Sequence, residues 1–415
     1  MRVFRLGMRS VVGAFVTATV LCTAAWSASG DVLWEQEIAS GYSVLAPQLA
    51  VLDSWVFAHS TDYSTGPPVE VLNAYWADSG QHAWEARGRA GWDKVALGQS
   101  VAAARDRVLT ATELLPEGKG NSTVAEITAR EAATGVLLWT RELDDENHYL
   151  IWQIAASRDG VFVVGRRTQG RKSQAMILAL DVVTGKTLWS DFFTFVGPYD
   201  EGQRVTLAKG RVIVSAASST GSSVSGSPSV LRAYNARTGR LLWQTHRADR
   251  RFVNLTAYRS RVYAVGMKGS AIVSAYDIGS GERLWKRRVR RASSDSITAT
   301  RKAVAVYGRD FRGNSVLQVL DRKSGQPLWA GQDEDTWGFQ VLGYRGRLYA
   351  IGIKEIEAGL YFAAFMSKTG RQLWSYPDRY PEKVDETTTG WQMLVHRNSL
   401  LAALTDKAVV TAIEP

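Results

Sequence analysis

A short pattern, Ser/Thr-Gly-x-x-x-Trp, recurs seven times along this chain of 415 residues. Successive tryptophans of the pattern are 42 to 55 residues apart, and Leu precedes the tryptophan in every copy but the first. A fixed interval between glycine and tryptophan in seven copies indicates a repeat architecture rather than independent core tryptophans. The pairs are Gly80/Trp84, Gly135/Trp139, Gly185/Trp189, Gly239/Trp243, Gly281/Trp285, Gly325/Trp329 and Gly370/Trp374.

Each copy predicts a β-hairpin. In the middle copies an Asp or Asn stands four residues before the glycine, where its side chain can bond its own downstream backbone and open a turn. The glycine then supplies the positive φ that closes the turn. Further strand-like runs lie upstream, so that each unit of about 45 residues holds four antiparallel strands, which is one propeller blade. In the fifth unit these runs are Phe252–Ala257, Arg261–Val265, Ala271–Tyr276 and Arg283–Lys286.

The repeated tryptophan falls on the fourth, outermost strand of each predicted blade. We expect its ring to lie flat against the next blade, where burying about 150–250 Å² of aromatic surface would hold neighbouring blades together.

The two ends of the chain predict how the ring closes. After Trp374 three strand-like runs remain, at Trp391–His396, Ser399–Leu404 and Ala408–Ile413, and the fourth is missing. A matching strand with an eighth tryptophan, Trp34, occurs at Val32–Glu37. The sequence therefore predicts an all-β, eight-bladed propeller of four-stranded antiparallel blades, in which the N-terminal strand completes the last blade and no incomplete blade leaves a free edge. We expect a monomer.

The first 28 residues are typical of a secretory signal peptide. Arg2, Arg5 and Arg9 precede a short apolar run, and small residues near Ala28 offer a cleavage site. A retained membrane anchor is less favoured, because the run is shorter than the ~20 residues that span a bilayer. We thus expect a propeller at residues 29–415 that is periplasmic or extracellular, or in the ER lumen if the source is eukaryotic. Cleavage would remove the only cysteine, Cys22, whose lipidation is disfavoured because Leu21 precedes it.

The chain is basic, with a formal net charge of +10. Basic residues gather at Arg247, Arg250 and Arg251 and again at Lys286, Arg287, Arg288, Arg290 and Arg291. Such runs can bind an anionic partner. We favour the simpler interpretation of a solvated outer strand and loop, and we expect no nucleic-acid partner for an exported protein.

Alternation of strands places the connections on two faces. One face receives the turns between the first and second strands together with the Ser/Thr-Gly turns. The other receives the longer connections 62–68, 115–122, 166–173 and 218–229, and the inter-blade loops Asp191–Gln203 and Ser375–Gly390. These two inter-blade loops are rich in aromatic residues, which predicts either a protein-binding surface or local packing under the loops. The candidate partner-binding residues are Phe192, Phe193, Phe195, Tyr199, Tyr376 and Tyr380.

No pattern of known catalytic chemistry occurs in the chain. The five histidines are not at metal-ligand spacing, and the acidic run at 144–146 lacks the alternating oxygen ligands and glycine of a calcium loop. Neither a Gly-x-Ser-x-Gly elbow nor the complete phosphate-binding pattern Gly-x-x-x-x-Gly-Lys-Ser/Thr is present. We therefore assign no catalytic, cofactor-binding or metal-binding residue.

The repeat Asp-x-x-Thr/Ser-Gly-x-x-x-Trp resembles the tryptophan-docking motif of the quinoprotein (PQQ-type) propeller superfamily, over essentially the whole chain from residue 29. One branch contains PQQ-dependent alcohol dehydrogenases, which use calcium, a catalytic Asp and a vicinal disulfide; the expected mature chain has no cysteine. The branch of the outer-membrane assembly factor BamB is more similar, and it implies a non-catalytic scaffold without a cofactor. Such a scaffold presents its inter-blade loops to a protein partner, which can be membrane-associated.

A luminal relative is a third alternative, similar to the propeller of subunit 1 of the ER membrane protein complex. The sequons at Asn121 and Asn254 would fit a glycosylated luminal protein, although such sequons also arise by chance.

Overall fold

The computed structural model describes residues 32–413, apart from 38–47, 63–68, 89–91, 117–123, 144–147, 171, 195–199, 219–227, 248–250, 268–269, 290–295, 311, 313, 334–335, 355–358, 377–390, 397–398 and 405–408. The predicted signal peptide lies outside these residues. Within them, no helix has the length and apolar character needed to cross a membrane.

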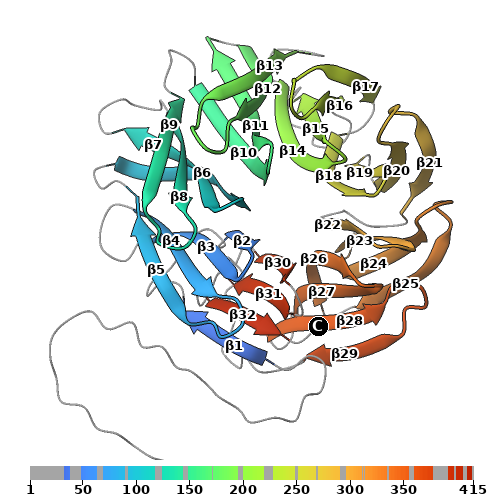
Figure 1. The fold of residues 1–415 in the computed structure, drawn as a ribbon. Coiled ribbons are helices and arrows are strands. Elements are labelled where there is room, and N and C mark those ends of the chain that lie inside the picture. The colour runs from blue at the N-terminus through green and yellow to red at the C-terminus, as the bar shows by residue number, and fades with distance from the viewer. Residues whose placement is uncertain are drawn as a thin grey trace, which may run out of the picture.

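Eight four-stranded antiparallel sheets surround a central axis, each with its first strand innermost (Figure 1). Blade 1 comprises β2 (Gln48–Leu52), β3 (Trp55–Asp62), β4 (Val69–Trp76) and β5 (His82–Arg87). Blade 2 comprises β6 (Trp92–Ala104), β7 (Arg107–Pro116), β8 (Val124–Glu131) and β9 (Leu137–Leu143). Blade 3 comprises β10 (His148–Ser157), β11 (Gly160–Gln169), β12 (Lys172–Leu180) and β13 (Thr187–Phe193). Blade 4 comprises β14 (Asp200–Ala208), β15 (Arg211–Ser218), β16 (Ser229–Asn235) and β17 (Leu241–Arg247).

Blade 5 comprises β18 (Arg251–Tyr258), β19 (Arg261–Met267), β20 (Ala271–Asp277) and β21 (Arg283–Arg288). Blade 6 comprises β22 (Ser296–Ala299), β23 (Ala303–Arg309), β24 (Ser315–Asp321) and β25 (Pro327–Asp333). Blade 7 comprises β26 (Thr336–Tyr344), β27 (Arg347–Lys354), β28 (Gly359–Met366) and β29 (Gln372–Tyr376). The predicted all-β, eight-bladed propeller is confirmed.

Blade 8 is built from both ends of the chain. Its sheet order is β1-β32-β31-β30, in which β1 (Val32–Glu37) is the outer strand beside β30 (Trp391–His396), β31 (Ser399–Leu404) and β32 (Val409–Ile413). The strand β1 runs antiparallel to β32, with Trp34 opposite Ala412 and Glu37 opposite Val409. This pairing gives the last blade its fourth strand (Figure 1).

The seven repeat glycines all have a positive φ of 68° to 74°. In blade 3 the carboxylate of Asp181 accepts hydrogen bonds from the amides of Val183 and Thr184 and from the Thr184 hydroxyl, which fixes the turn before Gly185. The same bonding recurs at Asp277 and Asp321, and Asn235 accepts the two corresponding amide bonds. These carboxylates accept several bonds, which holds the pKa of Asp181 below its ordinary value, with the Thr184 hydroxyl as the largest cause.

Every repeat tryptophan except Trp374 of blade 7 lies against the Ser/Thr-Gly turn of the following blade. Around the ring, blade 8 is followed by blade 1. A Cβ added to Gly239 would stand 2.6 Å from ring atoms of Trp189, so the indole rests directly on the glycine backbone. The Trp189 Nε1–H also donates to the Ala236 carbonyl at 2.9 Å. Equivalent contacts and hydrogen bonds join Trp34, Trp84, Trp139, Trp243, Trp285 and Trp329 to the next turn.

Trp374 is the exception, and its position explains why. In blade 8 the third and fourth strands, β32 and β1, come from opposite ends of the chain and are not joined by a Ser/Thr-Gly turn that Trp374 could contact. Its Nε1 is buried and finds no hydrogen-bond partner within the described residues.

A second set of inter-blade contacts surrounds the axis, and the sequence did not reveal it. Polar side chains on first strands accept hydrogen bonds from backbone amides of the first strand in the following blade. Gln153 Oε1 accepts the amide of Val205 at 2.9 Å, and Ser100 Oγ accepts that of Ile154 at 3.0 Å. The remaining contacts join Ser296 to Val341, Gln340 to Met393 and Gln392 to Leu49.

Two predicted segment boundaries differ from the structure. Residues 166–173 do not form a long loop, because β11 and β12 remain paired as far as Gln169 and Lys172. The predicted loop at Asp191–Gln203 is shorter as well, because β13 continues to Phe193 and β14 begins at Asp200. In both places the ladder of backbone hydrogen bonds extends beyond the apolar alternation that the sequence displays.

Candidate functional site

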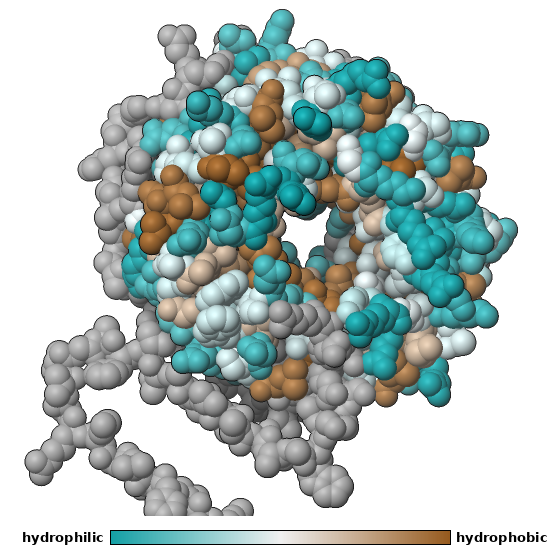
Figure 2. All heavy atoms as spheres, in the orientation of Figure 1, coloured by the Kyte–Doolittle hydropathy of each residue, from teal (hydrophilic) through white to brown (hydrophobic). Residues whose placement is uncertain are grey.

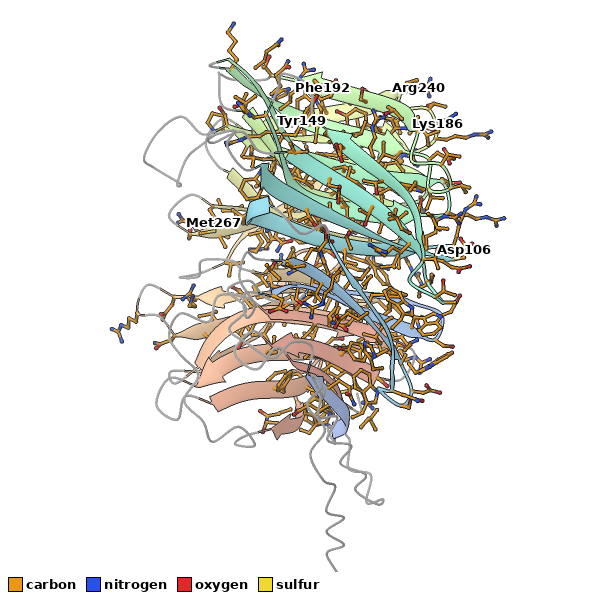
Figure 3. All side chains as sticks on the ribbon, turned by 90° about the vertical axis from the view of Figure 1, so that its left-hand side faces the viewer. Asp106, Tyr149, Lys186, Phe192, Arg240 and Met267 are labelled. Atoms are coloured by element: carbon orange, nitrogen blue, oxygen red, sulfur yellow. The ribbon has the colours of Figure 1, made fainter. Side chains whose placement is uncertain are left out.

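The two faces of the ring differ in how their strands are connected. Figure 3 shows Asp106, Lys186 and Arg240 at one face and Tyr149, Phe192 and Met267 at the other. We call the first the tight-turn face, formed by the connections between first and second and between third and fourth strands. We call the second the loop-rich face, which receives the connections between second and third strands and between blades.

Two described aromatic residues at the loop-rich face, Phe192 and Phe193, lie against arginine guanidinium groups. The guanidinium of Arg167 lies 4.0 Å from the ring centre of Phe192, which is partly buried. That of Arg232 lies 3.7 Å from the ring centre of Phe193, and it also bonds the Asp191 carboxylate at 2.9 Å. Both contacts are in the range of cation–π attraction.

The prediction that Phe193 binds a partner is wrong. It is only 5% exposed and packs with Ala175, Ala216 and Val230 between blades 3 and 4. Because β13 extends to this residue, Phe193 is a core side chain and is not available to a partner. Phe192 keeps partial exposure beside it. Phe195, Tyr199 and Tyr380 lie outside the described residues, and for Tyr376 only the backbone, which ends β29, is described.

Two arginines of the predicted basic runs contact the next blade, whereas Lys286 and Arg288 are exposed on the outer strand β21. Arg287 on β21 donates to the Gly325 carbonyl at 3.0 Å and to Gln326 at 2.9 Å, and so clamps the turn of blade 6. Arg247 on β17 donates to the hydroxyl of Tyr276 at 3.2 Å. Both arginines therefore contact the neighbouring blade. Arg250, Arg290 and Arg291 lie outside the described residues.

The first strand of blade 3 carries an exposed tryptophan. A bulge between Ile151 and Gln153 leaves Trp152 out of the ladder with β11, and its side chain is 41% exposed. A bulge re-aims a side chain that the regular pleat would pack.

Charged side chains are buried inside blades 1 and 2. His59 Nε2 lies 2.7 Å from Glu70 Oε1, and both side chains are buried. Burial raises the pKa of Glu70, but attraction to His59 and hydrogen bonds with His59, Thr110 and Thr112 outweigh it and hold that pKa below its usual value. Glu70 and Glu126 also line a pocket of about 170 Å³ between blades 1 and 2.

Glu113 on β7 is the other buried carboxyl group that matters. It is 1% exposed, and its Oε1 accepts the amide of Ile151 in blade 3 at 2.7 Å. Desolvation by burial raises its pKa to about 8, against the opposing effects of that amide and of Arg166. The other oxygen, Oε2, is buried and has no hydrogen-bond partner in the described structure. The sequence analysis did not find His59, Glu70 or Glu113, and their only signal was a charged residue within an otherwise apolar strand.

Within the described residues no three His, Cys, Asp or Glu side chains are grouped so that they could hold a metal ion. Glu70 and Glu113 each make a contact that joins two blades. Because no such group of ligands is present among them, the described residues do not fit the calcium that accompanies the quinone in dehydrogenases of the superfamily.

Comparison with known proteins identifies the family. A family model described as outer membrane protein assembly factor BamB matches residues 68–331 and 269–415. The chain belongs to this family. A search of curated proteins finds no match.

Solved structures similar to this BamB-family chain share its fold. BamB from Moraxella catarrhalis aligns with a TM-score of 0.60 at 17% identity, covering 93% of this chain and all of that one. A europium-containing methanol dehydrogenase aligns with a TM-score of 0.60 at 12% identity, covering 90% of this chain and 84% of the enzyme. Sqt1 from Saccharomyces cerevisiae aligns with a TM-score of 0.62 at 12% identity, covering 94% and 100%. An assembly factor and an enzyme thus share one fold, which alone does not assign an activity.

Proposed function

We propose that this chain is an exported, non-catalytic scaffold that holds a protein partner at its loop-rich face, in the assembly of the cell envelope. Membership of the BamB family supports the scaffold role. The observation that carries the proposal is the division of connections between the two faces. The tight-turn face has short turns fixed by backbone and Asx bonding, whereas the connections free to vary in length and composition are on the other face.

The buried charges fit a scaffold better than an enzyme. His59 and Glu70 form a buried ion pair, and Glu70 also bonds the hydroxyls of Thr110 and Thr112 in the next blade, so both side chains are enclosed within the blades. One oxygen of Glu113, Oε1, accepts the backbone amide of Ile151 in blade 3. These groups join blades and leave binding to the loops.

The test replaces residues 195–199, the aromatic inter-blade segment beside Phe192, with a Gly-Ser linker of equal length. The matched control makes the same replacement at 219–227, a segment of the same face without aromatic residues. Affinity capture from a membrane extract should lose its partner with the first variant and retain it with the second. If every captured protein stays bound to both, the assignment of this loop is wrong.

A second measurement separates the scaffold from an enzyme. We expect the protein to bind no quinone when it is mixed with PQQ and calcium. A bound quinone chromophore together with dye-linked alcohol oxidation would overturn the proposal.

A further inference from the structure

The tight-turn face has a composition that the scaffold role does not explain. In the described connections of this face, thirteen exposed side chains are Lys or Arg and five are Asp or Glu. The difference, eight positive charges, compares with a formal net charge of +10 for the whole chain. The cations are Arg105, Arg158, Lys186, Lys209, Arg237, Arg240, Arg259, Arg301, Lys302, Lys323, Arg345, Lys368 and Arg371.

Seven of these cations form an inner ring. They stand in the turns between first and second strands, close to the axis, in every blade from 2 to 7. In blade 1 the corresponding exposed residue is Asp53. Six of the eight blades therefore place a Lys or Arg in this turn, next to Asp106 in blade 2 and Asp159 in blade 3. Figure 2, which views this face, shows hydrophilic side chains beside the central opening.

The backbone at four of these cations argues that the charge is not incidental. Arg105, Lys209, Arg259 and Arg345 have φ of 59°, 50°, 57° and 46°, at the first position of two-residue hairpins. This left-handed conformation favours Gly, Asn or Asp, and the blade 1 turn follows that preference with Asp53 at a φ of 53°. At each of these four positions Lys or Arg makes the left-handed turn less stable than Asn would.

Apolar side chains surround the same face. Among the large hydrophobic side chains of the described residues that are exposed, all except Trp152 lie in its turns, at the start of a fourth strand, or at the end of β4. They are Leu33, Trp76, Val136, Leu137, Leu138, Val183, Leu188, Leu241, Leu284 and Leu328. Several hydrophobic patches lie towards the rim in Figure 2. Exposed apolar groups confined to one face indicate a binding surface.

We propose that the tight-turn face rests on an anionic lipid bilayer, with its ring of cations over the headgroups and its apolar rim in the interfacial layer. A bilayer fits both observations, because it offers many negative charges in one plane and an apolar layer beneath them. A soluble polyanion would use the cations alone. The proposal is independent of the proposed function, and it would leave the loop-rich face directed away from the membrane and open to a protein.

The test measures co-sedimentation with vesicles of phosphatidylcholine alone and of equal parts phosphatidylcholine and phosphatidylglycerol, using the protein as the cell produces it. The main variant combines Arg105→Asn, Lys209→Asn, Arg259→Asn and Arg345→Asn, which removes four charges while suiting the left-handed turns. The matched control removes four exposed charges elsewhere, with Arg141→Gln, Lys172→Gln, Lys286→Gln and Arg288→Gln. A third variant combines Leu188→Ser, Leu284→Ser and Leu328→Ser on the rim.

We expect binding to the anionic vesicles only. Each Lys or Arg near such a surface raises partitioning about fivefold. The Asn variant should therefore lower the partition coefficient by about 100-fold or more, and the control by much less. The Ser variant should weaken the binding that remains at high salt, where charge attraction is screened.

Three results would overturn the proposal. Equal binding to both kinds of vesicle would exclude recognition of anionic lipid. An equal loss in the Asn variant and the Gln control would show an effect of net charge rather than of this face. If heparin binds as tightly as the vesicles and the Ser variant changes neither, the face recognises soluble polyanions and not a bilayer.

Discussion

Substituting Gly239 by Ala tests the contact on which the blade interfaces depend. Gly239 has a φ of 69°, and an added Cβ would lie 2.6 Å from the Cγ and Cδ2 atoms of Trp189. The left-handed backbone costs Ala about 1–2 kcal/mol. The clash must also displace the indole, which adds about 1–3 kcal/mol of overpacking and about 1 kcal/mol for the hydrogen bond to the Ala236 carbonyl. We expect a total loss of about 3–6 kcal/mol.

The same blade contains a control for backbone strain. Gly210 has a φ of 67°, and nothing lies within 4 Å of its added Cβ. Gly210→Ala should therefore cost only the backbone portion, about 1–2 kcal/mol. In a Trp189→Ala background the indole is absent, so Gly239→Ala should cost no more than Gly210→Ala.

Urea unfolding followed by far-UV circular dichroism measures these differences, provided that the m-value is unchanged among the variants. The double-mutant cycle between Trp189 and Gly239 should give a coupling of about 2–4 kcal/mol. If Gly239→Ala and Gly210→Ala cost the same, or if the coupling is absent, the indole does not bear on the glycine and the account of the blade interface fails.

Two further predictions concern groups that the contacts single out. The pKa of Glu113 is raised to about 8 from an ordinary value of 4.5, so folding favours its protonated form. The contribution of this group to stability should be greatest below pH 4.5 and should fall as the pH rises through 8, by on the order of a few kcal/mol. Glu113→Gln should flatten that fall in unfolding measured between pH 6 and pH 9, and an unchanged slope would contradict it. Trp34→Phe removes the indole hydrogen bond to the Ala77 carbonyl, whereas Trp374 has no such partner in the described structure. Thermal unfolding should thus show that Trp34→Phe lowers stability by about 1 kcal/mol more than Trp374→Phe does. The reverse order would count against the role of this bond.

The tryptophan contacts between neighbouring blades were predictable because the residues that make each turn and its tryptophan are close together in the sequence. A positive-φ glycine and a tryptophan four residues later recur within one hairpin, with an Asx residue before the glycine in the middle copies. The seven copies, together with Trp34 as the eighth tryptophan, give the blade count. The polar contacts around the axis were not predictable. Gln153 and Ser100 are ordinary polar residues in their own strands, and they acquire a partner only when the next blade brings up an amide.

The candidate surfaces divide in the same way. The sequence placed Phe193 in a loop because strand pairing beyond the apolar alternation leaves no trace in composition; the structure buries it between blades. The basic turns were present in the sequence one at a time, about a blade apart, and none is unusual alone.

By itself, the sequence determined the fold class, the number of blades and which strand would complete the last one, because turn chemistry and repeat spacing act over a few residues. Only the tertiary structure decided which side chains meet across blades and which gather on one face. Those relations join residues far apart in the chain, and they exist only once the ring brings equivalent positions into one plane.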